Sequence, residues 1–273
     1  MKEMTLQDVQ AVSLDIMKHL DAFCKEHNIK YSLGYGSLIG AIRHKGFIPW
    51  DDDLDVVMMR EDFEKFCAIY EDSSKYKLFS YNRKNMYQPM GRLCEMQESY
   101  VMTALPLFTE QTGVWIDIFP LDSVDDDKQQ FDLRKGIVED SFNRVWQCRY
   151  NMRRWKSFKS LIHLKTFWLW ILNVRRARRQ INDLVKHFND LCVSFASPSS
   201  KMMSLLVFPA YIKRDWSPKT VFDETLSVPF EDSYFRAMRG YDEWLRIIYG
   251  DYMKLPPEEK RKAGHSSHKF YWR

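Results

Sequence analysis

The clearest hydrophobic pattern in this chain begins with an apolar run that stops at a Gly-Tyr-Gly-Ser turn, residues 34–37. Residues 38–44, which follow the turn, are amphipathic and predict a short helix. Residues 54–59 are apolar except for one aspartate, and this run predicts a buried strand. Because side chains alternate across a strand, Asp53 and Asp55 are predicted to share the face opposite the core.

Further helices and strands are predicted on both sides of this stretch. Apolar positions at helical spacing predict helices over residues 5–27 and 61–72, which we expect to cover the sheet. Thr5 and Asp8 form a capping box that predicts the start of the first helix. Short alternating runs over residues 76–104 predict two or three antiparallel strands.

A second strand that carries an acid is predicted over residues 112–122. Apolar residues alternate there with Trp115, Asp117 and Phe119, so Asp117 is predicted to share a face with two aromatic rings. Asp122 follows a proline, which favours a turn or a helix N-cap at that position.

Residues 127–190 are helical in pattern and distinctly basic. The apolar run 161–174 lies within them; it is too short for a membrane span and is interrupted by His163 and Lys165. Two alternatives remain open: the run lies in the headgroup region of an anionic membrane, or it is a buried helix contact with solvated flanks. No nucleic-acid-binding module accompanies these basic residues, so no nucleic-acid partner is expected. The basic residues are Arg134, Lys135, Arg144, Arg149, Arg153, Arg154, Lys156, Lys159, Lys165, Arg175, Arg176, Arg178 and Arg179.

Near the end of the chain, residues 233–249 predict a helix with Asp232 as N-cap and Gly250 as its stop. Two consecutive prolines then end the regular structure, and the terminal loop-like residues bring His265 close to His268.

Composition fits a well-cored globular protein. The chain has 273 residues, 45% of them hydrophobic and 15% aromatic, and a net charge of +4, too mild for a general polyanion binder. Its polar N-terminus has no apolar segment of the kind found in signal peptides, so none is expected. The five cysteines are scattered, which argues against a zinc site or a disulfide framework and favours a reducing cytosol. They are Cys24, Cys67, Cys94, Cys148 and Cys192.

The acids Asp53 and Asp55 indicate the chemistry of the site. Two carboxylates a few ångströms apart repel by roughly 4 kcal/mol at an effective dielectric near 20. This repulsion must be reduced either by protonation of one acid or by a cation bound between them. Their hard oxygen ligands suit Mg²⁺ or Mn²⁺. Backbone N–H groups at Gly36 and Ser37 would face the anion that the metal holds. The EF-hand pattern fails here, because a strand and not a glycine follows the acids.

Several basic residues are candidates for contact with phosphate. Arg92 is predicted either to contact phosphate or to form a cross-strand ion pair with Glu95 or Glu98. Arg43 is favoured as a donor-phosphate or leaving-group contact, together with Lys45, and its alternative is a salt bridge to the local aspartates.

Two segments of the chain resemble a known protein family. The stretch GSLIGAIRHKGFIPWDDDLDVVMMREDFEKF, together with WIDIFPLD, resembles the LicD family of phosphotransferases, which is related to the fukutin-type enzymes within the nucleotidyltransferase superfamily. The resemblance is dense over residues 31–66 and 112–122 and weaker near the end of the chain. It implies an α+β fold, a nucleotidyltransferase-like mixed β-sheet flanked by helices. On that basis we predict a catalytic core over 1–124, a basic helical region over 125–207 and a C-terminal segment, 208–273, that folds back on the core.

The resemblance also implies roles for individual residues. Gly36 and Ser37 would contact phosphate, Asp53 and Asp55 would bind Mg²⁺ or Mn²⁺, and Asp117 would be the third catalytic and metal-binding acid. Two further residues are candidates for substrate contact. Trp115 would help to cage a choline headgroup, and His268 would reach the site because the end of LicD-like chains tends to fold back over it.

The function implied is transfer of a phospho-alcohol, phosphocholine first among them, from a CDP-linked donor to a sugar hydroxyl, with release of CMP. The acceptor would be a glycan or lipid-linked glycan precursor of the cell surface, such as lipopolysaccharide or teichoic acid. The location would be cytoplasmic, with peripheral contact at the inner face of the membrane. Two alternatives remain: a nucleotidyltransferase that moves the NMP itself, and a noncatalytic membrane-surface or glycan-binding protein.

Overall fold

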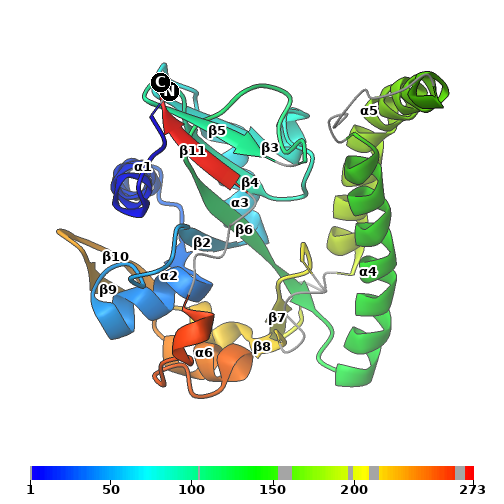
Figure 1. Ribbon diagram of the computed structural model, residues 1–273. Coiled ribbons are helices and arrows are strands. Elements are labelled where there is room, and N and C mark those ends of the chain that lie inside the picture. The colour runs from blue at the N-terminus through cyan, green and yellow to red at the C-terminus, as the bar shows by residue number, and fades with distance from the viewer. Residues whose placement is uncertain (1, 104, 153–161, 196–198, 209–214, 262–267) are drawn as a thin grey trace.

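The computed structural model describes residues 2–103, 105–152, 162–195, 199–208, 215–261 and 268–273 (Figure 1). Its helices are α1 Leu6–Glu26, α2 Tyr35–Ile39, a π-helix Gly40–His44, α3 Arg60–Ile69, α4 Lys128–Asn151, α5 Ile162–Ser194 and α6 Tyr241–Tyr249, with 3₁₀ turns at Tyr81–Arg83, Lys219–Phe222 and Glu258–Lys260. Its strands are β1 Ser32–Leu33, β2 Asp55–Met59, β3 Tyr76–Ser80, β4 Gly91–Glu95, β5 Ser99–Thr103, β6 Trp115–Val124, β7 Met202–Ser204, β8 Ser217–Pro218, β9 Thr225–Phe230, β10 Ser233–Met238 and β11 His268–Trp272.

Within the described residues, the centre of the molecule is a mixed seven-stranded sheet. Its main path has the order β1-β2-β6-β4-β3, and β7 and β8 extend it from the far end of β6. Strands β2 and β6 run parallel, whereas β4 pairs with β6 and β3 in antiparallel fashion. Two antiparallel pairs complete the strands: the hairpin β9–β10, and β5 with β11 from the end of the chain. This confirms the predicted α+β class and its mixed sheet.

Helices α1 and α3 pack side by side on one face of this sheet. The predicted capping box starts α1, since Asp8 N–H donates to Thr5 Oγ1 and Thr5 N–H donates to the Asp8 carboxylate. Phe23 of α1 meets Phe66 of α3 edge-on. Phe63 of α3 lies beside the face of the sheet that carries Ile118. Asp117 alternates with Ile118 and therefore points to the opposite face, where the site lies.

The prediction for Asp122 was wrong, because Asp122 lies inside β6, and the neighbouring Pro120 does not end the strand. Asp117 N–H donates to the carbonyl of Leu54, the residue just before β2. The backbone N–H groups of the odd-numbered residues of β6 therefore point toward β2, and the nitrogen of Pro120 points to the other side. On that side β4 ends its pairing at Ile118, and β7 begins at Asp122. The missing proline N–H thus falls in a gap between two partner strands, where no ladder bond is lost.

The helix predicted over residues 233–249 is two elements. Ser233–Met238 forms β10, paired with β9, and only Tyr241–Tyr249 is helical as α6. Phe235 and Ala237 are buried and alternate with the exposed Tyr234. This alternation has the period of a strand, and the segment pairs with β9. Asp232 lies in the hairpin turn rather than at an N-cap, whereas Gly250 ends α6 as predicted.

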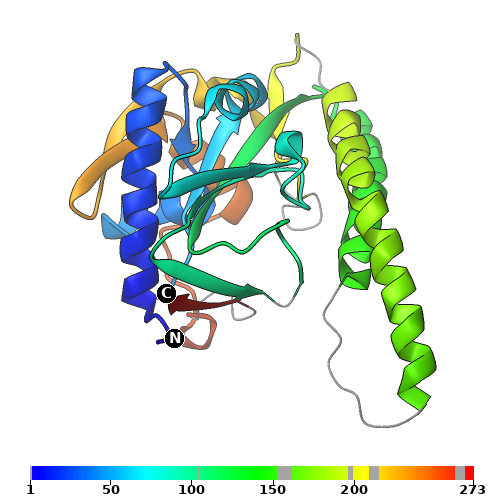
Figure 2. The same cartoon turned by 90° about the horizontal axis from the view of Figure 1, so that it is seen from above.

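Helices α4 and α5 form an antiparallel hairpin beside the sheet (Figure 1 and Figure 2). The prediction of helices over residues 127–190 is confirmed for the described parts, and residues 153–161, with Arg153, Arg154, Lys156 and Lys159, lie outside them. No helix in the described ranges combines the length and apolar character needed to cross a bilayer.

Arg60 joins the helical hairpin to the sheet. Its guanidinium makes a two-pronged ion pair with the fully buried carboxylate of Asp122, with nitrogen–oxygen distances of 2.7 and 2.8 Å. A third donor, Arg60 Nη1, lies 3.0 Å from the Asn189 side-chain oxygen on α5. The pair raises the pKa of Arg60, although burial opposes this.

We expect Asp122→Ala to lower the free energy of unfolding by about 3–5 kcal/mol, because it leaves the Arg60 guanidinium buried without its counter-charge. Urea unfolding followed by circular dichroism measures this change. The control is Asp132→Ala, which removes one partner of the exposed pair Lys128–Asp132 and should change stability by less than about 0.5 kcal/mol. Equal losses in the two variants would contradict the role given to Asp122.

Candidate active site

The site is organised by the pairing of two strands that each bring an acid. In the parallel ladder between β2 and β6, Asp55 is the direct partner of Asp117. Neighbouring strands lie about 4.8 Å apart, so side chains of such a pair emerge next to each other. Both residues are buried, Asp55 at 9% exposure and Asp117 at 5%. Asp53 is half-buried and lies just before β2, in the loop that leads into the strand.

The Gly-Tyr-Gly-Ser segment lies directly against the start of β2. Gly34 N–H donates to the Asp55 carbonyl at 2.9 Å, and Asp55 N–H donates to Ser37 Oγ at 2.8 Å. Residues 35–39 form the first helical turns, so Ser37 lies in α2 rather than in an open turn before it. Ser37 therefore holds the backbone of the acid-bearing strand through its hydroxyl group, and its phosphate contact remains a prediction.

Gly36 lies beneath the side chain of Asp51. A Cβ atom at position 36 would lie 2.8 Å from Asp51 Oδ2, closer than real Cβ contacts come. Gln10 of α1 fixes the same aspartate from the backbone, because its side-chain amide donates to the Asp51 carbonyl at 2.8 Å. The glycine thus leaves space for a third carboxylate beside Asp53 and Asp55.

The neighbouring acids raise the cost of ionising Asp55. Burial raises the pKa of Asp55 well above its usual value, and the charges of Asp53, Asp117 and Asp51 raise it further, while Arg92 opposes them. The site therefore concentrates negative charge in a place with little water. A bound cation is the arrangement that would let all these carboxylates stay ionised.

Arg92 of β4 is the direct ladder partner of Asp117, and the two side chains form a close ion pair. Its guanidinium also lies over the ring of Trp115, 4.8 Å from the ring centre, and over Phe108 at 5.6 Å. Arg92 Nη1 is buried and has no hydrogen-bond partner among the described residues. The cross-strand ion pair was predicted with the wrong acid, because Glu95 instead accepts the backbone N–H groups of residues 97–99.

Arg43 and Lys45 lie at the C-terminal end of the π-helix. Arg43 donates to the carbonyl of Tyr252 at 2.6 Å and to His44 at 2.9 Å, so its guanidinium holds the segment after α6. Lys45 adopts a left-handed backbone conformation, φ 62°, and its ammonium bonds the Ile42 carbonyl. The structure uses both residues to shape the loop before the acids, and it does not test their predicted phosphate contacts.

His268 and Trp115 are brought together by the last strand. β11 pairs with β5 in antiparallel fashion, and the His268 ring packs against Trp115 in a T-shaped arrangement with ring centres 5.4 Å apart. Trp115 in turn lies under Arg92. His268 thus reaches the surroundings of Asp117 through one aromatic ring, whereas His265 lies outside the described residues.

Sequence patterns missed three side chains near the acids: Tyr249 of α6, the Tyr35 hydroxyl and Asp215. Burial and the charges of Asp55, Asp51 and Asp53 raise the pKa of Tyr249. Burial and the charge of Asp215 raise the pKa of Tyr35, whose ring packs on Trp244 at 5.0 Å. Burial also raises the pKa of Asp215, to about 6. Tyr35 lies within the Gly-Tyr-Gly-Ser segment, whereas no motif marks Tyr249 or Asp215, and the packing of α6 against α2 brings Tyr249 here.

The oxygen donors of the site are of the chemical type that a hard divalent cation prefers. Asp53, Asp55 and Asp117 supply carboxylate oxygens from one loop and two neighbouring strands, as Mg²⁺ and Mn²⁺ prefer. The Arg92 bond to Asp117 leaves carboxylate lone pairs for a further ligand. The described residues contain no group of three or more His, Cys, Asp or Glu side chains arranged closely enough to hold a metal ion. The metal remains a prediction.

Comparisons with known proteins give the family. The family described as LicD/FKTN/FKRP, nucleotidyltransferase domain, matches residues 28–159. The lipopolysaccharide cholinephosphotransferase LicD of Haemophilus influenzae is 31% identical over 272 residues, which is 97% of both chains. The chain belongs to the LicD family of phosphotransferases. Shorter matches link this LicD-family enzyme to uncharacterised proteins of Rickettsia typhi, 36% identical over 34% of this chain and 30% of the relative, and of Rickettsia prowazekii, 44% identical over 22% and 23%.

The match to the Haemophilus protein also covers regions of this LicD-family chain outside residues 31–66 and 112–122, where the motif resemblance is dense. It takes in most of the α4–α5 hairpin and most of the last sixty residues, where Tyr249 and His268 lie. The likeness to the Haemophilus protein is therefore not confined to the motif region.

We expect Asp55→Asn to stabilise the fold while it abolishes activity. The pKa of Asp55 is raised in the folded state, so its stabilising contribution is present at low pH and is lost as pH rises through the folded pKa. At neutral pH the substitution should therefore raise stability on the order of 1 kcal/mol, about 2–4 °C in Tm. Differential scanning calorimetry at pH 5 and pH 8 measures the difference, which should be larger at the higher pH.

The same measurement tests the metal. Added Mg²⁺ should raise the Tm of the wild type, because a ligand that binds only the folded state stabilises it, and should leave the Tm of Asp55→Asn unchanged. Asp132→Asn, an exposed acid on α4, is the control and should respond to Mg²⁺ as the wild type does. A lowered Tm in Asp55→Asn, or an equal response to Mg²⁺, would contradict this account.

Gly36→Ala should reduce activity by about tenfold or more while the protein still folds, because the new methyl group displaces the Asp51 carboxylate. The matched control is Gly136→Ala in α4, where an added Cβ meets nothing within 4 Å. That change should leave activity intact and raise stability by up to about 1 kcal/mol. Initial rates and thermal unfolding of both variants test this, and full activity in Gly36→Ala would exclude a role for the Asp51 position.

Proposed function

We propose that this enzyme transfers phosphocholine from CDP-choline to a sugar hydroxyl of a cell-surface glycan precursor and releases CMP. The observation that carries the proposal is the match over 97% of both chains to a lipopolysaccharide cholinephosphotransferase. The pairing of Asp55 with Asp117 supports it, because buried acids on neighbouring strands suit a phosphoryl-transfer site. We further propose that the sheet is a nucleotidyltransferase-type core.

The chemistry assigned to the chain is mainly positioning. The acceptor hydroxyl would attack the phosphorus bonded to choline oxygen, a new phosphorus–oxygen bond would form, and the bond to CMP would break in line. Asp117 would take the proton of that hydroxyl or orient the metal. A bound Mg²⁺ or Mn²⁺ would neutralise the charge of the two phosphates, held by Asp53, Asp55 and Asp117.

Arg92 is the side chain best placed to bind the donor phosphates. Its Nη1 is a buried charged donor without a hydrogen-bond partner among the described residues, and such a group is costly unless a ligand meets it. Asp117 and the ring of Trp115 hold the guanidinium in position. In this proposal Nη1 donates to a phosphate oxygen, and the backbone N–H groups of Gly36 and Ser37 take a second one.

The choline headgroup would be recognised by aromatic faces near the acids. Trp115 is covered on one side by Arg92 and at its edge by His268, which leaves Tyr35 and Phe119, with ring centres 5.8 Å apart, as the other rings on the acid-bearing face. A quaternary ammonium ion is attracted to such faces. Phosphoethanolamine, glycerol phosphate and ribitol phosphate are the competing groups in this assignment.

Two other functions use the same scaffold. A nucleotidyltransferase would keep the acids and the metal but move the NMP, and a glycan-binding protein would need no ionised acid at all. The family and the buried, mutually repelling carboxylates favour the phosphotransferase, since binding a neutral sugar gives no reason to collect them. We propose that the reaction takes place at the cytoplasmic side of the membrane, where a lipid-linked acceptor and CDP-choline are both present.

Product analysis tests this proposal. The protein is incubated with Mg²⁺, a panel of CDP-alcohols and a glycan acceptor, and we expect free CMP together with phosphocholine on the acceptor. Asp53→Asn and Asp117→Asn should each lower the rate by about a thousandfold or more with circular dichroism unchanged, because each removes a metal-binding carboxylate. The control Asp52→Asn makes the same charge change next to Asp53 and should cost less than about tenfold.

Other outcomes identify the alternatives. Pyrophosphate release from CTP, or an acceptor that carries the nucleotide, would support the nucleotidyltransferase. Glycan binding that survives Asp53→Asn, without release of CMP from any donor, would support the noncatalytic protein.

A further inference from the structure

The α4–α5 hairpin divides into a mixed-charge half and a purely basic half. Between Asp140 and Asp183, the residues of α4 and α5 include seven lysines and arginines and no aspartate or glutamate. The opposite half carries acids as well, and exposed pairs such as Lys128–Asp132 and Lys186–Asp190 join them. The unbalanced positive charge therefore belongs to the end of the hairpin that lies far from these pairs.

The N-terminal end of α5 extends past the end of α4. Cys148 of α4 lies beside Ala177 of α5, with Cys148 Sγ 3.4 Å from the Ala177 carbonyl oxygen. α4 ends three residues later, at Asn151, whereas α5 begins fifteen residues before Ala177, at Ile162. At 1.5 Å per residue the excess length is about 18 Å. Figure 2 shows this end of α5 extending beyond its partner helix.

The extension carries exposed apolar side chains in line with arginines. Trp168, Leu169 and Leu172 expose 60%, 59% and 59% of their surface. Helical spacing places Trp168 and Leu172 on one stripe with Arg175 and Arg179, which are also exposed. We call Trp168, Leu172, Arg175 and Arg179 the outer stripe. The face opposite it, with Ala177, Ile181 and Val185, is buried.

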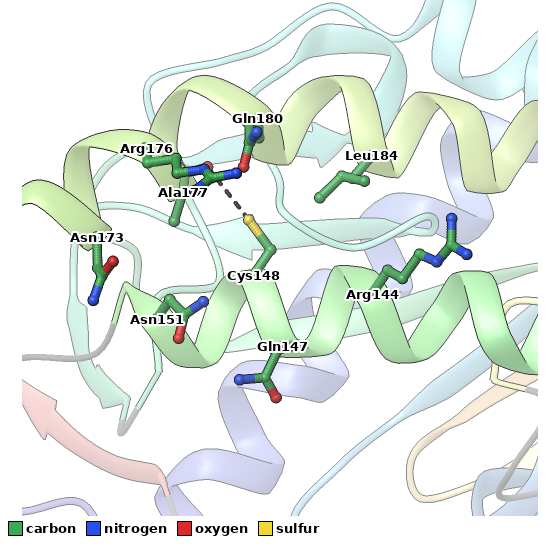
Figure 3. Close-up of a pocket in the computed structure, with 9 residues that line it drawn as sticks. All are labelled: Arg144, Gln147, Cys148, Asn151, Asn173, Arg176, Ala177, Gln180 and Leu184. Carbon is green, nitrogen blue, oxygen red and sulfur yellow. Dashed lines mark hydrogen bonds between the residues drawn. The ribbon is translucent and has the colours of Figure 1, made fainter.

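A pocket opens beside the outer stripe, between the two helices (Figure 3). Its volume is about 340 Å³, and Arg144 of α4 and Arg176 of α5 line it together with the side-chain amides of Gln147, Asn151, Asn173 and Gln180. Guanidinium groups suit phosphate oxygens, and amides suit hydroxyl groups. The pocket therefore has the donors that an anionic, hydroxyl-bearing headgroup needs.

We propose that the basic end of the α4–α5 hairpin docks on the surface of an anionic phospholipid bilayer. Trp168, Leu169 and Leu172 enter the boundary between headgroups and acyl chains, and Arg175 and Arg179 bind headgroup phosphates. This inference concerns a different part of the molecule from the proposed transfer reaction.

Charge and apolarity together select this occupant. A second copy of the chain would bring its own arginines against these, which costs free energy through like-charge repulsion. An acidic polymer in water would leave Leu169 and Leu172 without an apolar partner. An anionic bilayer supplies both an apolar layer and a layer of phosphates, and the stripe presents the two kinds of residue in that order along the helix.

The geometry of α5 suits a helix that lies along this boundary. Trp168, Leu172, Arg175 and Arg179 lie on one side of α5, and Leu172 and Arg179 are about 10 Å apart along the axis. A helix in the plane of the interface buries its apolar side chains by about 5–10 Å, and the long side chains of the two arginines can reach the phosphates from the same side.

Vesicle flotation tests the proposal with the full-length chain. We expect the wild type to float with vesicles of phosphatidylcholine mixed with phosphatidylglycerol, and to stay unbound with phosphatidylcholine alone. High salt should weaken the binding. The variant Arg175→Ser/Arg179→Ser should bind about 25-fold more weakly, since each basic residue near an anionic surface contributes about a fivefold factor. Trp168→Ser/Leu172→Ser should bind at least about tenfold more weakly.

The matched control is Leu133→Ser/Ile137→Ser, which removes exposed apolar residues from the mixed-charge half of α4, where they expose 67% and 54% of their surface. It should bind vesicles like the wild type. All variants change exposed residues, and circular dichroism and transfer activity with a water-soluble acceptor verify their folds. The proposal is overturned by a wild type that ignores phosphatidylglycerol vesicles, by equal losses in the control, or by a dimer in sedimentation equilibrium that Trp168→Ser/Leu172→Ser disrupts.

Discussion

The parallel pairing of β2 with β6 is the constraint on which the site depends. It places Asp55 opposite Asp117, both of them buried, and no hydrogen bond between two carboxylates can relieve the repulsion while both are ionised. The surrounding residues limit this cost. Arg92 pairs with Asp117 from the next strand, while Ser37 and Gly34 hold the backbone of Asp55. The fold thus keeps a costly cluster of charge in one geometry, as the proposed binding of a cation and phosphates would require.

Distant parts of the chain are needed to hold that geometry. The turn between β9 and β10 reaches the loop before the acids: Glu231 N–H donates to the Lys45 carbonyl, and the Glu231 carboxylate accepts the Phe47 N–H. Arg43 donates a hydrogen bond to the carbonyl of Tyr252, in the segment after α6. Ser32 of β1 accepts the Met238 N–H from β10 through its hydroxyl. Residues from the last third of the chain therefore hold the loop that leads to Asp51 and Asp53, which accords with a likeness to the Haemophilus protein over nearly the whole length.

The local pattern of apolar and polar residues correctly predicted the helices and strands that bury one face. It gave wrong predictions where pairing with a distant strand determines the secondary structure. The capping box of α1, the strand after Asp53 and the alternation around Asp117 depend on neighbours in sequence, so they were predictable. Strand β10 and the continuation of β6 past Pro120 depend on where β9, β4 and β7 begin and end, which no local pattern contains. For the same reason the motifs gave Asp53, Asp55 and Asp117 but neither Tyr249 nor the ion-pair partner of Arg92.

The contact between β1 and β10 has a consequence for how the protein matures. More than two hundred residues separate Ser32 from Met238, and loop closure over such a distance is slow and comes late in folding. On the ribosome the Gly-Tyr-Gly-Ser segment and the aspartates that follow it emerge early. The loop between them is fixed only after the β9–β10 hairpin has been made and has folded against it. A newly made chain would therefore gain its catalytic competence among the last events of folding, and until then its strand edges would be exposed to chaperones.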